Sequence, residues 1–244
     1  MNCYHVDLHV HTTASSDGRS TLEQQVSAAR KAGLHAIAVT DHNRCTPVPQ
    51  EMDGVLLIPG CELSAQCGHI LGLFLERPID FDALGHMPAG EEAVAAIRAC
   101  GGLAVLAHPF QNPTRMEEDL PEDADGIECK NARGDLKRSN ANAMAEELAA
   151  SRALPMTGGS DAHHSNEVGY AYTEIYANEL TLADLRDALA CGRCKPILQR
   201  STSYTQKGLS QWESARKKPF PRKVKGLLYL CRNICKDLIP RKIR

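Results

Sequence analysis

The stretch DLHVHTTASSDG, residues 7–18, places three potential metal ligands close together. Residues 4–11 alternate apolar and polar side chains, which predicts a β-strand with two different faces. One face would carry Tyr4, Val6, Leu8 and Val10, and the other His5, Asp7, His9 and His11. His9 and His11 are two residues apart, so an extended strand points both imidazoles the same way, and Asp17 follows in the next loop.

Strand and helix patterns alternate beyond this stretch. Strands are expected at 35–43, 55–62, 69–75, 101–109, 125–129, 155–163 and 171–177, and helices near 20–33, 90–100, 139–152 and 181–192. A capping box of Ser20 and Glu23 is expected to begin the first helix, which ends at Gly33. The alternation predicts an α/β fold with a mostly parallel sheet, as one barrel or one doubly wound domain. A chain of 244 residues with 43% hydrophobic content can bury such a core.

Histidine and acidic residues gather where the predicted strands end. The candidates are His9, His11, Asp17, His42, Glu62, His69, His108, Asp161 and His163. Ligands bind at the carboxyl ends of strands in such sheets and barrels. A lone histidine or a lone HxH pair would be weak evidence, but five strand ends converging indicate a metal site. Mixed imidazole and carboxylate ligands suit Zn, Mn, Fe or Ni. Nine ligands exceed the needs of one ion and suggest two or three, an arrangement that serves displacement at phosphorus.

The motifs HVH, TDHN, GCE, GHILG, AHP and SDAH occur in this order over about residues 3–176. As a set they resemble the PHP (polymerase and histidinol phosphatase) superfamily of metal-dependent phosphoesterases. The resemblance implies a distorted seven-stranded, TIM-like β/α barrel with a trinuclear site at its carboxyl end. It assigns His9, His11, Glu62 and Asp161 to one ion, Glu62, His69 and His108 to a second, and Asp17, His42 and His163 to a third. Asp17 leaves Mn or Fe open beside Zn, and Asp41 is expected to support a ligand or to be structural.

The same resemblance implies hydrolysis of a phosphomonoester or nucleotide phosphate by a metal-activated hydroxide. Glu62, His11, Asp161 and His163 would be the catalytic residues. Arg133, after the strand at 125–129, is expected to clamp the substrate phosphate with Lys130 nearby, unless both are solvated loop charges. Only 38 residues separate His69 from His108, too few for the helical insertion of some relatives that cleave small nucleotide phosphates. The pocket is therefore expected to be open.

Two other functions remain open at this point. One is a 5′–3′ exonuclease acting on short 5′-phosphorylated single strands. The other is a non-catalytic metal-binding module that is recruited through its basic tail. The complete ligand set favours an enzyme over such a module.

Charge divides the chain into an acidic body and a basic tail. The net charge is −2, but residues 200–244 carry 13 Lys+Arg and 2 Asp+Glu, which leaves −13 on the rest. We expect a barrel over 1–198, a basic linker over 199–222 and a basic amphipathic helix over 223–244 that ends near Pro240. Its apolar stripe would contain Val224, Leu227, Leu228, Cys231, Ile234, Cys235 and Leu238. The helix is expected to dock on its own barrel; the alternatives are an anionic membrane surface, nucleic acid or another chain.

The sequence also bears on the cellular compartment. No uninterrupted apolar stretch of about 18 residues occurs, and the first residues do not resemble a signal peptide. The ten cysteines are scattered rather than regularly spaced. These features predict a cytoplasmic protein with reduced thiols.

Overall fold

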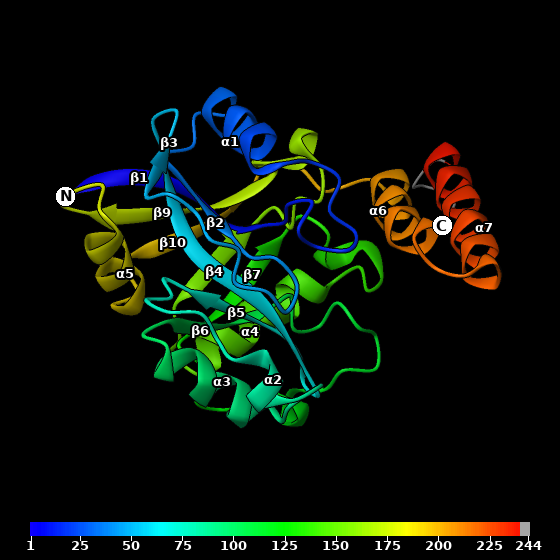
Figure 1. Ribbon diagram of the computed structural model, residues 1–244. Helices are drawn as coiled ribbons and strands as arrows, with labels where there is room; N and C mark the ends of the chain where they lie inside the picture. Colours follow the sequence, from blue (N-terminus) through cyan, green and yellow to red (C-terminus); the bar gives the residue numbers. More distant parts are fainter. Residues whose placement is uncertain (240–244) are drawn as a thin grey trace.

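The computed structural model describes residues 1–239, which form a barrel-shaped mixed sheet surrounded by helices (Figure 1). The strands are β1 (Asn2–Val10), β2 (Ala36–Val39), β3 (Glu51–Met52), β4 (Val55–Ala65), β5 (Gly68–Leu73), β6 (Leu103–Ala107), β7 (Gly126–Asn131), β8 (Met156–Gly159), β9 (Ala171–Ala177) and β10 (Cys194–Leu198). The helices are α1 (Leu22–Lys31), α2 (Phe81–Leu84), α3 (Gly90–Ala99), α4 (Ala141–Ser151), α5 (Leu182–Ala190), α6 (Tyr204–Arg216) and α7 (Phe220–Leu238).

The strands follow the order β10-β9-β1-β2-β4-β5-β6-β7-β8, with β3 paired to β4. β8 packs against β1, β9 and β10, so the sheet nearly closes on itself. The predicted barrel is confirmed, although this path holds nine strands where the family resemblance implied seven. The sheet is also less parallel than expected. β4 and β5 are joined by two residues, Gln66 and Cys67, and a connection too short for a helix forces strands to run antiparallel.

Helices cover the barrel on several sides and complete its core. Val94 of α3 and Leu148 of α4 belong to one buried cluster with Ile70 and Ile127 of the sheet. The second cluster joins α5 to the strands, and the third joins α1 to β2 and β4. α5 and the α6–α7 hairpin lie at opposite sides of the barrel in Figure 1.

The start of α1 differs by one residue from the expectation. Thr21, not Ser20, is the N-cap, and Gln24 completes the capping box. Ser20 instead accepts a hydrogen bond from the backbone N–H of Ser165, 2.9 Å away. This tertiary contact decides between two neighbouring hydroxyl residues that the local sequence leaves equivalent. Gly33 has the expected positive φ, +72°, beyond the end of the helix.

The tail contains more regular structure than expected. The prediction of an irregular linker over 199–222 is wrong for residues 204–216, which form α6, and α7 begins at Phe220 rather than at 223. Ser203 caps α6 by accepting from the N–H of Gln206. α7 crosses α6 closely because Gly226 has no side chain: a Cβ there would lie 2.3 Å from the Cβ of Ala215. The expected helix end near Pro240 lies outside the described residues.

The apolar stripe of α7 does not dock on the barrel. α7 packs mainly against α6, and its buried residues are Gly226, Leu230 and Asn233. Stripe residues such as Leu227 and Leu228 are exposed. The expected docking of the stripe on the barrel is thus not what the structure shows; α6 stands between α7 and the body. Within residues 1–239, no helix has the length and apolar character needed to cross a membrane. All ten cysteines are free thiols.

Candidate metal centre

Glu62, near the middle of β4, lies at the centre of the predicted ligands. Its carboxylate oxygens lie 2.7 Å from His69 Nδ1, 2.8 Å from His42 Nδ1, 3.1 Å from His108 Nε2, 3.3 Å from His11 Nε2 and 3.5 Å from His9 Nε2. The residue is 1% exposed. Five imidazoles around one buried carboxylate are unusual for a purely structural site.

His9, His11 and Asp161 form a compact group beside Glu62. His9 Nε2 and His11 Nε2 are 3.1 Å apart. Asp161 Oδ1 lies 3.5 Å from His11 Nε2 and 3.8 Å from His9 Nε2. Donor atoms that share an ion at about 2.1 Å are separated by about 3.0–3.4 Å at tetrahedral or octahedral angles. The spacing therefore fits a divalent ion. Glu62 Oε2 is buried and accepts no well-aligned hydrogen bond among the described residues, although His42 Nδ1 lies 2.8 Å away.

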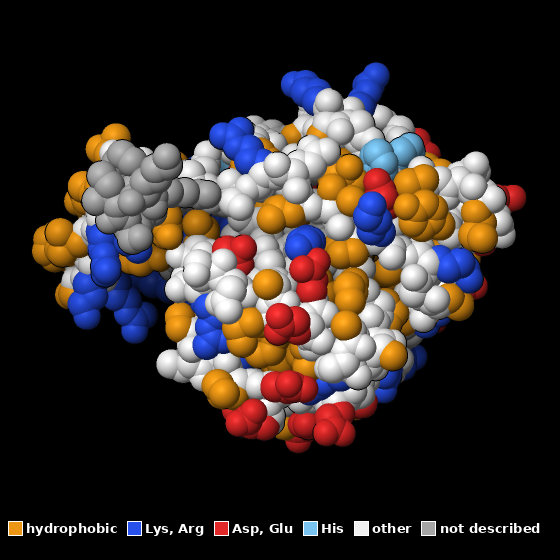
Figure 2. Space-filling model, turned by 180° about the vertical axis from the view of Figure 1, so that it is seen from behind, with side chains coloured by type: hydrophobic (Ala, Val, Ile, Leu, Met, Phe, Trp, Pro, Cys, Tyr) orange, Lys and Arg blue, Asp and Glu red, His pale blue; other side chains and the backbone are white. Residues whose placement is uncertain are grey.

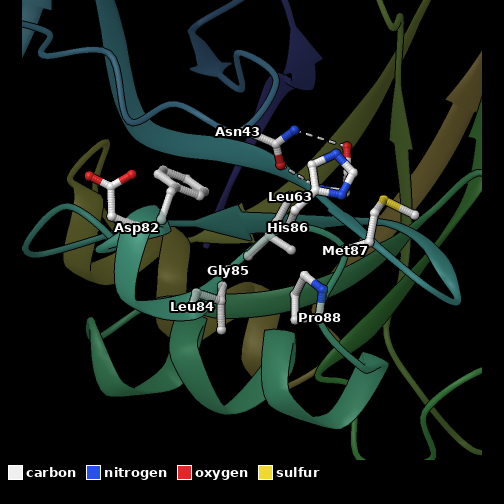
Figure 3. A pocket seen from close by; sticks show the side chains of 10 residues that line it. Asn43, Leu63, Asp82, Leu84, Gly85, His86, Met87 and Pro88 are labelled. Atoms are coloured by element: carbon white, nitrogen blue, oxygen red, sulfur yellow. Dashed lines mark hydrogen bonds between the residues drawn. The ribbon is translucent and has the colours of Figure 1, made fainter.

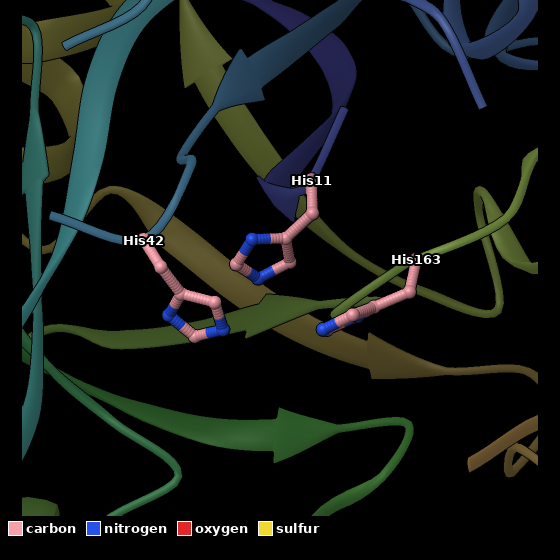
Figure 4. Close-up of side chains that lie close together, drawn as sticks. All are labelled: His11, His42 and His163. Atoms are coloured by element: carbon pink, nitrogen blue, oxygen red, sulfur yellow. The ribbon is translucent and has the colours of Figure 1, made fainter. Parts of the chain in front are cut away.

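A neighbouring group contains Asp17, His42 and His163. The rings of His11, His42 and His163 point toward a common centre (Figure 4), with centroids of His11 4.5 Å from His42 and 4.3 Å from His163. Asp17 Oδ2 lies 3.1 Å from His163 Nε2 and 3.8 Å from His42 Nε2. Its other oxygen is buried without a hydrogen-bond partner among residues 1–239. The structure thus brings all nine predicted ligands together, and their donor atoms suit divalent metal ions.

Further side chains hold the imidazole rings in place. His9 Nδ1 lies 3.0 Å from Glu128 Oε1, and His11 Nδ1 lies 3.2 Å from the hydroxyl of Ser15. Ser15 donates to Asp41, so Asp41 supports a ligand indirectly and also orders its loop. Such contacts fix the tautomer and orientation of ligand histidines. Sequence reasoning missed Glu128; the signal was an acidic residue inside the short strand DGIEC.

The backbone around the ligands is unusual. His108 and Asp161 have positive φ values of +30° and +52°, a region that non-glycine residues seldom adopt. Strained residues of this kind gather at functional sites. Gly159, just before this turn, has no room for a side chain: a Cβ would lie 2.5 Å from the Cβ of His9 and 2.7 Å from Glu128 Oε1. The close approach of β8 to β1 is what brings Asp161 to the histidine pair.

Electrostatics keep Glu62 ionised and favour the charged form of His11 when metal is absent. Burial alone would raise the pKa of Glu62, but His69, His42 and His9 outweigh burial and hold it well below the ordinary value. Burial opposes charge on His11, yet the carboxylates of Asp161 and Glu62, 3.5 and 3.3 Å from its Nε2, raise its pKa to about 9. Divalent ions would therefore replace protons on binding, which makes affinity depend on pH.

Cations border the cavity formed by the ligands. This cavity, of about 140 Å³, is lined by ligands together with Arg133, Lys137, Lys207, Gln111 and Gln211. Arg133 is 5% exposed; its Nη2 donates to both oxygens of Glu167 at 2.8 Å and to Ser210 at 3.1 Å. Lys130, the other predicted substrate residue, does not line this cavity; it pairs with Glu146 of α4 at 2.7 Å.

Lys207 of α6 was missed because its segment was expected to be a linker. The residue is 8% exposed, and its Nζ has no hydrogen-bond partner among residues 1–239. Burial, and then the charges of Lys137 and Arg133, lower the pKa of Lys207 to about 7. With Gln211 it makes α6 one wall of the cavity. The pocket is consequently less open than the spacing of His69 and His108 predicted.

Two further cavities continue from the central one in sequence. The first shares His69, His108, Gln111 and Lys137 with it and extends to Arg115. The second, between β4 and the α2–α3 segment, shares Ser64 and Met87 with the first (Figure 3). Asn43 stands at its edge, with its amide bonded to Ser64. Together they lead away from the metal ligands over the end of the sheet.

Comparisons with known proteins agree with this arrangement. Residues 7–104 match the PHP domain family, and residues 139–194 match the PHP-associated family. An uncharacterized protein of Methanocaldococcus jannaschii is 32% identical over 143 residues, which are 52% of this chain and 81% of that protein. A probable phosphatase of Serratia proteamaculans is 32% identical over 43% of this chain, and the match spans 54% of that protein.

Solved structures share the fold. One is a two-domain protein of Bacteroides vulgatus that contains a predicted PHP-like metal-dependent phosphoesterase. Its TM-score is 0.61 at 22% identity, and the match covers 88% of this chain and 70% of the Bacteroides chain. A lesion-specific endonuclease of Pyrococcus furiosus has a TM-score of 0.59 at 20% identity, and the match covers 81% of this chain and 58% of the endonuclease chain. The two family matches, which together cover most of the barrel, show that this chain belongs to the PHP domain family.

Proposed function

We propose that this protein is a metal-dependent phosphatase that hydrolyses a phosphomonoester or nucleotide phosphate. The observation that carries the proposal is the carboxylate of Glu62 within 3.5 Å of five imidazole nitrogens. Membership of the PHP family and similarity to a probable phosphatase support a hydrolase acting on phosphate esters.

Two or three divalent ions would be held by the nine ligands, with Glu62 shared between neighbouring ions. Zn, Mn and Fe all fit mixed imidazole and carboxylate donors, and Asp17 favours a harder ion in the group of His42 and His163. When bound, such ions supply an activated water and neutralise charge on the phosphoryl oxygens. The catalytic assignment of Glu62, His11, Asp161 and His163 rests on their place among these ligands.

The remaining residues of the cavity would position the substrate. Arg133 keeps a buried Nε without a partner among residues 1–239 and borders the cavity, so it can still donate to a phosphate oxygen. Lys130 would not contact the substrate, because its ammonium pairs with Glu146 and the residue does not line the cavity. The organic part of the ester would extend into the adjoining cavity, toward Met87.

A second candidate is a nuclease that removes nucleotides from the 5′ end of short single strands. The cavity that leads from the ligands past Lys137 to Arg115 favours it, because those side chains could contact successive phosphates. A lesion-specific endonuclease also shares the fold. A phosphatase should release inorganic phosphate from small esters, whereas the nuclease should release mononucleotides from a 5′-labelled oligonucleotide.

Metal content and turnover, measured on the same sample, test the proposal. Elemental mass spectrometry should find two to three equivalents of Zn, Mn or Fe, and phosphomonoesters should release phosphate. Glu62→Gln should lower metal content and turnover together, whereas Glu51→Gln, at an exposed position of β3, should change neither. Metal-replete Glu62→Gln with wild-type turnover would refute the site. A protein that binds no metal and stays inactive with added Mn or Zn would instead favour a non-catalytic module.

A further inference from the structure

Lys207 occupies a position that demands an anionic partner. α6 turns a polar face toward the barrel: Gln206 accepts from Arg19, Ser210 accepts from Arg133, and Gln211 borders the cavity. Lys207 lies on this face and lines the same cavity, with its ammonium buried and unpartnered among the described residues. A buried ammonium without a hydrogen-bonded partner is costly. A ligand that enters the cavity can provide that partner.

The charge of the cavity indicates which ligand this is. Its carboxylates, Asp17, Glu62 and Asp161, face the space that divalent ions would fill, and those ions would neutralise them. Arg133 is already paired with Glu167. Lys207 and Lys137 then remain as cations without a carboxylate of their own among residues 1–239. Two positive charges are matched better by a phosphomonoester, which is a dianion, than by a phosphodiester, which carries a single negative charge.

We propose that Lys207 and Lys137 form a subsite for the phosphoryl group of a phosphomonoester, so that α6 selects monoesters over diesters. The proposal rests on the proposed phosphoesterase function and names its substrate class. Lys207 approaches from the buried wall, and Lys137 is exposed at the shared border of the two cavities. The tail thereby contributes directly to the site of the barrel.

Kinetics of Lys207→Met provide the first test. With p-nitrophenyl phosphate, kcat/KM should fall about 10- to 100-fold, the loss expected for a charge-assisted hydrogen bond. With bis(p-nitrophenyl) phosphate it should stay nearly unchanged, and metal content should equal that of the wild type. Lys218→Met, at an exposed position after α6, is the matched control and should behave as wild type. Equal losses on both esters, or no loss on either, would overturn the subsite.

Phosphate binding separates failure of the subsite from failure of the proposed function. Titration calorimetry of the metal-loaded protein with inorganic phosphate should show affinity that falls at least about 10-fold in Lys207→Met. If the wild type hydrolyses no phosphoester but this loss occurs, the subsite stands and the phosphatase assignment fails. Unchanged phosphate affinity overturns the subsite whatever the turnover. Lys207→Gln repeats the measurement if the methionine variant does not fold, as judged by circular dichroism.

The exposed face of α7 carries an independent inference. Phe220, Val224, Leu227, Leu228, Ile234 and Leu238 are 39–77% exposed on this one helix. Lys223, Lys225, Arg232 and Lys236 flank them, and Asp237 is the acidic residue of the described helix, turned toward the start of α6. Hydrophobic and basic side chains gather on this projecting hairpin in Figure 2, while acidic ones gather on the body.

We infer that this face of α7 binds an anionic membrane surface. A helix with an apolar face bordered by Lys and Arg lies in the interface of such membranes. A second copy of the chain fits less well, because pairing two such helices would bring their basic residues together. The hairpin stands at the side of the barrel (Figure 1), where α7 can reach a flat surface.

Vesicle sedimentation with the full chain tests this inference. The protein should bind vesicles that contain phosphatidylglycerol, bind less at high salt, and not bind vesicles of phosphatidylcholine alone. Leu227→Ser with Leu228→Ser should weaken binding at least about 10-fold, whereas Met116→Ser, an exposed methionine elsewhere, should not. Absence of binding at low salt would refute the inference. If the protein does not bind vesicles but self-associates in sedimentation velocity, and the Leu227 and Leu228 variant does not, the face would bind a second copy of the chain instead.

Discussion

Replacing Arg133 by Met should reduce the free energy of unfolding by about 3–5 kcal/mol. Arg133 Nη2 lies 2.8 Å from both oxygens of Glu167, and the two side chains are 6% and 0% exposed. Removing the guanidinium leaves the buried carboxylate with Arg19, 4.0 Å away, and the backbone N–H of His163. For a chain of this size the loss corresponds to a fall in melting temperature of about 6–20 °C.

Urea and thermal unfolding measure the effect, and a double variant tests its cause. Arg133→Met with Glu167→Gln removes both charges while the amide can still accept from the N–H of His163. It should therefore recover most of the stability that Arg133→Met loses. A loss below about 1 kcal/mol in the single variant, or no recovery in the double variant, would refute the ion-pair reasoning. If KM stays raised in the recovered double variant, Arg133 also contacts substrate.

Three further predictions follow from other parts of the molecule. Glu128→Ala should reduce metal affinity about 10- to 100-fold, because His9 loses the carboxylate that orients it; metal titration would show this, and unchanged affinity would contradict it. Gly226→Leu should separate α7 from α6 and destabilise the protein by about 1–3 kcal/mol in urea unfolding, with Lys225→Leu as the exposed control. In phosphate-free buffer, the free energy of unfolding of the wild type should rise with pH between 7 and 10.5 relative to that of Lys207→Met. The reason is that Lys207 releases its proton in the folded chain over this range, while the unfolded chain still keeps it. The rise should be no more than about 5 kcal/mol. The charged groups acting on Lys207 are Lys137, Arg133, Asp161 and Lys236, and a flat difference across this range would contradict its burial as an unpaired cation.

The sequence was sufficient to predict the barrel and the clustering of the candidate His, Asp and Glu side chains. HVH, AHP and SDAH stand at the ends of β1, β6 and β8, and the topology of the sheet brings these ends together. GCE was also expected at a strand end, but Glu62 lies inside β4, which continues to Ala65. The chemistry of imidazole and carboxylate then points to divalent metals without coordinates. The order of these motifs is specific enough to indicate the family from the sequence alone.

Partnerships between distant residues could not be predicted in the same way. Glu128 is one acidic residue in a short strand until β8 and β1 close around it. Arg133 looked free to bind substrate because its partner Glu167 lies 34 residues further along the chain. Lys130, three residues earlier, turns instead to Glu146. In each case the nearest charge in space decides the role of the side chain.

The sequence by itself therefore determined which His, Asp and Glu side chains cluster, and the basic amphipathic character of the last helix. These properties depend on side-chain type and on periods of two or 3.6 residues, which are local. Only the tertiary structure decided that α6 forms, that Lys207 enters the metal cavity and that the apolar stripe of α7 faces outward. Those outcomes depend on packing between segments far apart in the chain, and local preferences carry no information about such contacts.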